Sequence, residues 1–141
     1  MDDFYSLGLL VSRASVSLSK SLKSRFEVHN IDLPHSQFIV LRCLYYKDAL
    51  SQLEIANLLC KDPAAIKRTI DLLERKRFIV RNQVRTLKNS ICITDKGREL
   101  MPTAINIADC LIEEALNSID SVNRELLRTM LDKIYTNLEK K

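Results

Sequence analysis

The sequence predicts a mainly α-helical protein in which a winged helix-turn-helix core is flanked by long N- and C-terminal helices. Only two glycines and three prolines occur in 141 residues, and 46% of the residues are hydrophobic, which favours long helices over a loop-rich fold. Apolar residues recur every three or four positions near both ends, whereas the middle combines short helical and strand-like patterns. We expect one domain, with flanking helices at 1–32 and 95–141 and the winged helix at 33–94.

The first stretch, from about Asp3 to Val28, predicts a long amphipathic helix. Its apolar stripe consists of Phe4, Leu7, Val11, Ala14, Leu18, Leu22 and Phe26. A helix of this length has more apolar surface than one short domain can cover, so we expect a subunit interface in addition to core packing. A second helix should run from about Pro34 to Lys47.

The next helix should open at Ser51. Ser51 and Glu54 have the spacing of a capping box, in which the hydroxyl and the carboxylate each satisfy a free backbone amide. Leu53, Ala56 and Leu59 then fall on one face at helical spacing, and Ile55 and Leu58 widen that face. This pattern predicts the first helix of a helix-turn-helix pair.

Asp62 as N-cap and Pro63 at the first helical position predict where the second helix of the pair begins. Ile66, Ile70 and Leu73 form its buried seam. On the opposite face, alanines would let the backbone approach a DNA major groove while cations reach phosphates or guanine edges. The predicted DNA-binding residues here are Ala64, Ala65, Lys67 and Arg68, with Ser51 and Gln52 near phosphates. The alternative for the two cations is an ordinary solvated helix face.

Two strand-like segments follow, Phe78–Arg81 and Ser90–Thr94, and predict a hairpin. The segment between them carries Arg85 and Lys88. A basic hairpin tip beside a DNA-reading helix is typical of a wing that reaches the minor groove or the flanking backbone. The alternative is a simple surface turn.

The charge of the chain is concentrated on this middle module. Eleven Lys and Arg but four Asp and Glu lie between Lys61 and Arg98, a net charge of +7, whereas the whole chain carries +4 and the remainder therefore −3. Such a local excess of positive charge predicts a polyanionic partner, and double-stranded DNA is the first candidate.

Two more helices should follow the hairpin. Thr94 is the expected N-cap of a helix from Asp95 to about Asn117, with a bend rather than an end at Pro102. A last helix, from Asp120 or Ser121 to about Leu138, has the apolar stripe Val122, Leu126, Leu127, Met130, Ile134 and Leu138. Long striped helices at both ends predict a homodimer with two reading heads, and hence a pseudo-palindromic site with half-sites about one helical turn apart.

Four segments together carry a resemblance to a known family. They are Leu33–Leu41 (LPHSQFIVL), Leu50–Ala56 (LSQLEIA), Ala65–Glu74 (AIKRTIDLLE) and Ile93–Leu100 (ITDKGREL). In order and spacing they resemble the MarR family of bacterial transcriptional regulators. The resemblance implies a DNA-binding regulator, most often a repressor. It also implies a small aromatic effector between the dimerisation helices and the DNA module, near His35, Phe38 and Arg42. The alternative for these three residues is core packing at the foot of the second helix.

The chain departs from the family pattern at two places. Arg77 stands where the family usually has glycine after the second helix of the pair; if it adopts the left-handed conformation it should cost on the order of 1 kcal/mol relative to Gly. The wing lacks the usual Asp-x-Arg pattern and is about two residues short. These departures put the wing contacts in doubt.

Other chemistry is sparse. The four cysteines have no paired spacing, so neither a zinc site nor a disulfide framework is indicated, and no cofactor is expected. Cys60 lies just before the predicted reading helix, and both Lys61 and the N-terminus of that helix favour a thiolate there, which would suit a redox switch. The alternative is a thiol that simply packs at a turn. His29 and His35 have no carboxylate partner at ligand spacing. The absence of a nucleophile elbow, phosphate loop or catalytic carboxylate pair argues against an enzyme.

We therefore expect a cytoplasmic homodimeric transcription factor without a membrane segment, because the N-terminus is acidic and no apolar run is long enough to cross a bilayer. Two alternatives come from other classes. One is a helical dimerisation or adaptor protein that kept the fold but lost DNA binding, and the other is a thiol switch centred on Cys60.

Overall fold

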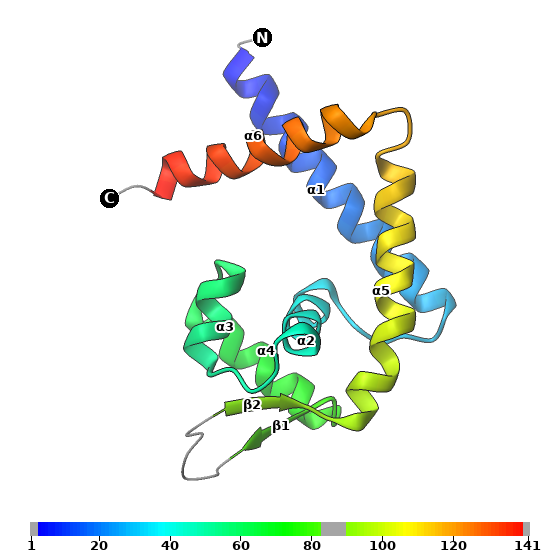
Figure 1. Ribbon diagram of the computed structural model, residues 1–141, viewed down its shortest axis with the longest axis vertical. Helices are drawn as coiled ribbons and strands as arrows, with labels where there is room; N and C mark the ends of the chain where they lie inside the picture. The colour runs from blue at the N-terminus through cyan, green and yellow to red at the C-terminus, as the bar shows by residue number, and fades with distance from the viewer. Residues whose placement is uncertain (1–2, 83–89, 140–141) are drawn as a thin grey trace.

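The computed structural model describes residues 3–82 and 90–139. Its elements are α1 (Asp3–Val28), α2 (His35–Tyr46), α3 (Gln52–Leu59), α4 (Pro63–Arg75), β1 (Ile79–Asn82), β2 (Ser90–Ile93), α5 (Asp95–Ala115) and α6 (Ser121–Glu139). Figure 1 shows α2, α3, α4 and the two strands grouped at one end, with α5 rising from them beside α1 and α6 crossing the far end. The helix order and the mainly α-helical class agree with the sequence prediction.

The winged-helix head has a continuous apolar core. Phe38 packs edge-on against Phe26 of α1, with ring centroids 5.3 Å apart, so the core joins the head to the C-terminal end of the first helix. The other large side chains that are almost fully enclosed are Val40, Leu41, Leu44, Ile55, Ile70, Leu73, Ile79, Ile91 and Met101. This core fixes α4 against α2 and the hairpin, and so determines which face of α4 reaches solvent.

The buried side of α3 is narrower than the predicted one. Ile55 and Ala56 are buried, whereas Leu53 is 60% exposed and Leu59 only partly covered. The helix packs through the face that contains Ile55 and Ala56, and its neighbours are α4 and α2. The expected seam of α4 is confirmed, since Ile66, Ile70 and Leu73 are all buried.

The hairpin is short and antiparallel. Ile79 pairs with Ile93 and Asn82 with Ser90, and an isolated bridge joins Leu50 to Ile91. This bridge makes the segment before α3 a third, single-residue partner of the sheet. The predicted wing residues Arg85 and Lys88 lie outside the described residues.

An unusual helix end connects α4 to the hairpin. Arg77 adopts the left-handed conformation, with φ 66°. Its N–H donates to the carbonyl of Glu74 at 3.0 Å, and the N–H of Phe78 donates to the carbonyl of Leu73 at 3.0 Å. These two bonds form a Schellman motif, so the arginine occupies the position that usually favours glycine.

The next helix begins with a close packing contact. The hydroxyl of Thr94 accepts a hydrogen bond from the N–H of Gly97 at 3.1 Å, which confirms Thr94 as the N-cap of α5. A Cβ at Gly97 would lie 2.7 Å from the carbonyl oxygen of Phe78. The glycine is therefore needed for the approach of the backbones. The helix then continues through Pro102 to Ala115.

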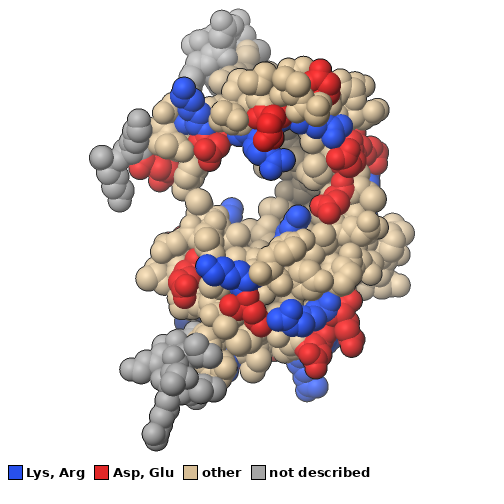
Figure 2. Space-filling view, viewed as in Figure 1, with Lys and Arg blue, Asp and Glu red and all other residues tan. Residues whose placement is uncertain are grey.

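The outer helices leave much apolar surface uncovered. In α1, Leu22 and Phe26 are buried, but Leu7, Val11 and Leu18 of the predicted stripe are exposed. No residue of α6 is buried. Figure 2 shows open space between this helix and the head on the face viewed. Within the single chain, α6 and the N-terminal half of α1 therefore have unpartnered apolar faces.

Among residues 3–82 and 90–139, none of the helices combines the length and the apolar character needed to span a membrane.

Candidate nucleic-acid interface

The first helix of the helix-turn-helix pair begins with the predicted capping box. The N–H of Glu54 donates to the hydroxyl of Ser51 at 3.1 Å, and the N–H of Ser51 donates to Oε1 of Glu54 at 3.1 Å. The hydrogen bonds from Ser51 lower the pKa of the Glu54 carboxyl. This reciprocal cap places Ser51 and Gln52 at the exposed start of α3.

The turn between α3 and α4 is equally well defined. Cys60 adopts the left-handed conformation, with φ 54°, and the N–H of Lys61 donates to the carbonyl of Ala56 at 3.0 Å. Asp62 caps α4 by accepting from the N–H of Ala65 at 3.2 Å. Gln52 also donates to the carbonyl of Pro63 at 3.4 Å. The start of α4 is therefore held by both helices of the pair.

The solvent-facing side of α4 carries the predicted residues. Ala64, Lys67 and Arg68 are exposed, and Ala65 is half-buried. The two cations differ in their surroundings. Lys67 forms an ion pair of 3.2 Å with Asp71 one turn later, whereas no ion pair joins Arg68 to another residue in the described ranges. Within residues 3–82 and 90–139, the first turns of α4 thus carry two alanines and a guanidinium that forms no ion pair.

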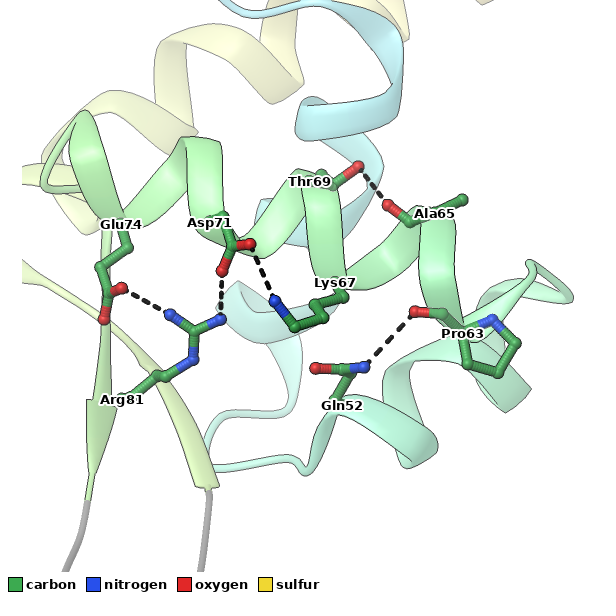
Figure 3. A network of polar contacts seen from close by, with 8 residues as sticks. All are labelled: Gln52, Pro63, Ala65, Lys67, Thr69, Asp71, Glu74 and Arg81. Atoms are coloured by element: carbon green, nitrogen blue, oxygen red, sulfur yellow. Dashed lines mark hydrogen bonds and ion pairs between the residues drawn. The ribbon is translucent and has the colours of Figure 1, made fainter.

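A polar network on the side of α4 nearest the wing was not predicted (Figure 3). Arg81 of β1 points between two carboxylates of the helix, with one amino group on Asp71 and the other on Glu74, both at 2.5 Å. Asp71 also accepts from Lys67. Hydrogen bonds from Arg81, and secondly from Lys67, lower the pKa of the Asp71 carboxyl.

Arg81 could not be found from local sequence signals. It lies ten residues after Asp71, beyond the end of the helix, and only the reversal of the chain at Arg77 returns it to α4. The predicted residues Ser51, Gln52 and Lys67 line the same surface hollow as Asp71 and Arg81, with a volume of about 600 Å³. The structure thus places Asp71 and Arg81 beside the predicted residues, and Glu74 joins them through its ion pair with Arg81.

The three residues predicted to line an effector site have different surroundings in the structure. His35 lines a hollow of about 620 Å³ between the end of α1 and the start of α2, together with Phe26. Phe38 is buried in the core. The guanidinium carbon of Arg42 lies 6.0 Å from the ring centroid of Phe38, and an amino group of Arg42 forms an ion pair of 3.6 Å with the carboxylate of Asp109 in α5.

Cys60, the predicted redox residue, is exposed at the end of α3. Its thiol lies 3.9 Å from the carbonyl oxygen of Asn57, to which it donates. Hydrogen bonding to this thiol raises the pKa of Tyr135 in α6 to about 12. Across the described parts of the chain, no group of three or more His, Cys, Asp or Glu side chains could hold a metal ion.

Comparisons with known proteins agree with this geometry. Residues 33–85 match the model of the MarR family. A curated relative, the uncharacterized HTH-type transcriptional regulator YybA of Bacillus subtilis, is 25% identical over 134 residues, which cover 93% of this chain and 85% of that protein.

Solved structures reproduce the whole arrangement. S. aureus MepR, solved as a complex with DNA, superposes on this chain with a TM-score of 0.86 and is 21% identical to it. The superposition covers 98% of this chain and 100% of the MepR chain. CouR from Rhodococcus jostii RHA1, bound to p-coumaroyl-CoA, gives a TM-score of 0.78 at 22% identity, with 91% and 90% covered. The middle of the chain, residues 33–85, is thus similar to the MarR family, and the chain as a whole shares the winged helix-turn-helix fold of these solved structures.

Proposed function

We propose that the protein acts as a homodimeric transcriptional repressor that binds a pseudo-palindromic DNA operator and is released by a small aromatic effector. The observation that carries the proposal is the exposed first half of α4. It presents Ala64 beside an Arg68 that has no acidic partner within the described ranges. Small side chains permit close approach to the bases, and an unpaired guanidinium suits phosphate or guanine.

The dimer is supported by the uncovered apolar faces. In α6, Leu126, Met130 and Ile134 are 52%, 54% and 43% exposed, and Leu7 and Val16 of α1 are 51% and 55% exposed. Contiguous apolar surface of this extent is rare on a protein that stays monomeric. A second copy that covers both helices would hold two α4 helices at a fixed separation, which matches a two-fold symmetric operator.

Proteins of the same fold support both proposed partners, DNA and a small-molecule effector. MepR was solved with DNA, and CouR with p-coumaroyl-CoA. In this chain the cavity beside His35 and Phe26 lies where α1 meets the head, so an aromatic occupant there could favour one separation of the heads over another. Repression, cytoplasmic location and release by an effector are parts of this proposal.

Selection of duplexes from a random pool tests the proposal. We expect wild-type protein to enrich a palindromic site and a Lys67→Ala/Arg68→Ala variant to lose it, because both cations lie on the exposed face of α4. Analytical ultracentrifugation should show that both proteins are folded dimers. If a folded wild-type dimer enriches no sequence at modest salt, the regulator proposal fails and a helical adaptor becomes the better description.

A further inference from the structure

The carboxylates of Asp71 and Glu74 create an electrostatic problem on α4. Both lie on the helix that is proposed to face DNA, and Asp71 belongs to the same hollow as Lys67 and Gln52. An uncompensated carboxylate near a phosphate backbone opposes binding, since like charges repel even through water. Some other group must therefore neutralise these acids.

We propose that Arg81 is a positioning residue of the DNA interface, which masks Asp71 and Glu74 and thereby keeps Lys67 available for phosphate. The inference rests on the proposed DNA binding. Arg81 reaches both acids at once, each through a separate amino group at 2.5 Å. A forked guanidinium can hold two carboxylates in this way, whereas an ammonium acts as a single point charge.

The sharing of Asp71 links Arg81 to Lys67. Oδ1 of Asp71 accepts from Arg81 and Oδ2 accepts from Lys67, at 2.5 and 3.2 Å. With Arg81 present, the negative charge of Asp71 is divided between two cations, and the lysine side chain, which is 61% exposed, can exchange the carboxylate for a phosphate. Without Arg81, the full charge of Asp71 would fall on Lys67 and hold it back.

The same ion pairs hold β1, the first strand of the hairpin, against α4. Arg81 belongs to β1 and both of its acidic partners belong to α4, so the network sets the strand against the helix (Figure 3). Among the described residues, Arg98 provides a matched comparison. Its ion pair with Asp48, at 2.8 Å, joins the start of α5 to the segment between α2 and α3 and involves side chains of similar exposure, but neither residue is on α4.

A double-mutant cycle tests the proposal. The six proteins are wild type, Arg81→Ala, Arg98→Ala, Asp71→Asn and each arginine variant combined with Asp71→Asn. The affinity for a fluorescent duplex, taken from the selection above, is measured at low and high salt. We expect Arg81→Ala to weaken binding about fivefold at low salt, the equivalent of one uncompensated surface charge, and less at high salt.

If Arg81 masks the charge of Asp71, the Asp71→Asn substitution should restore most of the lost duplex affinity in the Arg81→Ala protein. The same substitution should give a smaller gain in affinity in the wild-type and Arg98→Ala proteins. The thermal unfolding midpoint of Arg81→Ala should stay lowered in the double variant, because the strand remains detached from the helix. A purely structural role would instead make affinity and unfolding midpoint recover together.

Equal gains from Asp71→Asn in all three backgrounds would show that net charge alone matters, and this result would overturn the role of Arg81 while leaving DNA binding intact. If wild-type protein binds no duplex even at low salt, the proposed function and the inference fail together.

Discussion

The hydroxyl of Thr94 donates a hydrogen bond of 2.7 Å to the carbonyl oxygen of Arg77, and so ties the start of α5 to the end of α4. Arg77 reaches this position only because it adopts the left-handed conformation that turns the chain toward β1. Lys96 adds a second contact by donating to the carbonyl of Lys76 at 2.9 Å. The orientation of α4 relative to α5 thus depends on a residue in a strained backbone conformation.

Arg77→Gly should stabilise the protein by about 1 kcal/mol, because glycine adopts φ 66° without the steric cost that a side chain incurs there. Denaturant unfolding at one protein concentration measures the change. Arg75→Gly is the matched control: it removes a similar side chain from the last helical residue of α4 and should destabilise by about 1 kcal/mol. Equal destabilisation by the two glycines would contradict the strain argument.

Gly97→Ala should destabilise the protein by about 1–3 kcal/mol. Its Cβ would lie 2.7 Å from both the carbonyl oxygen of Phe78 and Cγ1 of Ile93, and the backbone oxygen cannot move without disturbing the start of the hairpin. Thermal unfolding of this variant is compared with that of Glu99→Ala on the exposed side of the same helix, where little change is expected. An unfolding midpoint equal to that of wild type would show that the contact can relax.

Features within one helical turn could be predicted from the sequence, whereas contacts between distant segments could not. The capping box at Ser51 and the N-cap at Asp62 depend on residues three positions apart, so their spacing is sufficient. The exposed position of Leu53 depends on where α4 and α2 pack against α3, and apolar periodicity on so short a helix does not determine that. Arg81 meets Asp71 through a chain reversal for which the sequence offers an arginine instead of the usual glycine.

Met130→Glu in α6 should weaken the homodimer by at least about tenfold, because it would bury a charge in the proposed interface. Met130 is 54% exposed in the single chain and lies in the apolar stripe of its helix. Sedimentation equilibrium measures the dissociation constant. Thr129→Glu introduces the same carboxylate at the adjacent, polar position and should leave the dimer unchanged. Dimers of equal strength in both variants would place the interface elsewhere.

Arg68→Ala should reduce duplex affinity more than Lys67→Ala. Arg68 has no ion pair in the described part of the chain, whereas Lys67 must give up Asp71 before it reaches a phosphate. Binding measured over a range of salt concentrations should show that the log–log slope falls by about 1 for each cation that contacts a phosphate. A larger loss from Lys67→Ala would show that Asp71 orients the lysine for DNA rather than competing for it.

Acidification below about pH 6.5 should destabilise the protein through His35. Burial, and secondly the charge of Lys61, lower the pKa of His35 from its ordinary value of 6.5 in the native state. Between the two pKa values the unfolded chain binds a proton that the native protein does not, so stability falls as the pH falls through this window, and above it the histidine contributes nothing. Denaturant unfolding at roughly pH 8 and roughly pH 5 should therefore show a smaller pH-dependent loss for His35→Gln than for wild type. Both His35 and His29 are exposed at the surface, and the same substitution at His29, whose ring lies 3.0 Å from the carbonyl of Arg25, is the control. If His35→Gln retains the full loss of stability, the acid sensitivity arises from other groups, and protonation of His35 does not oppose the packing of α2 against α1.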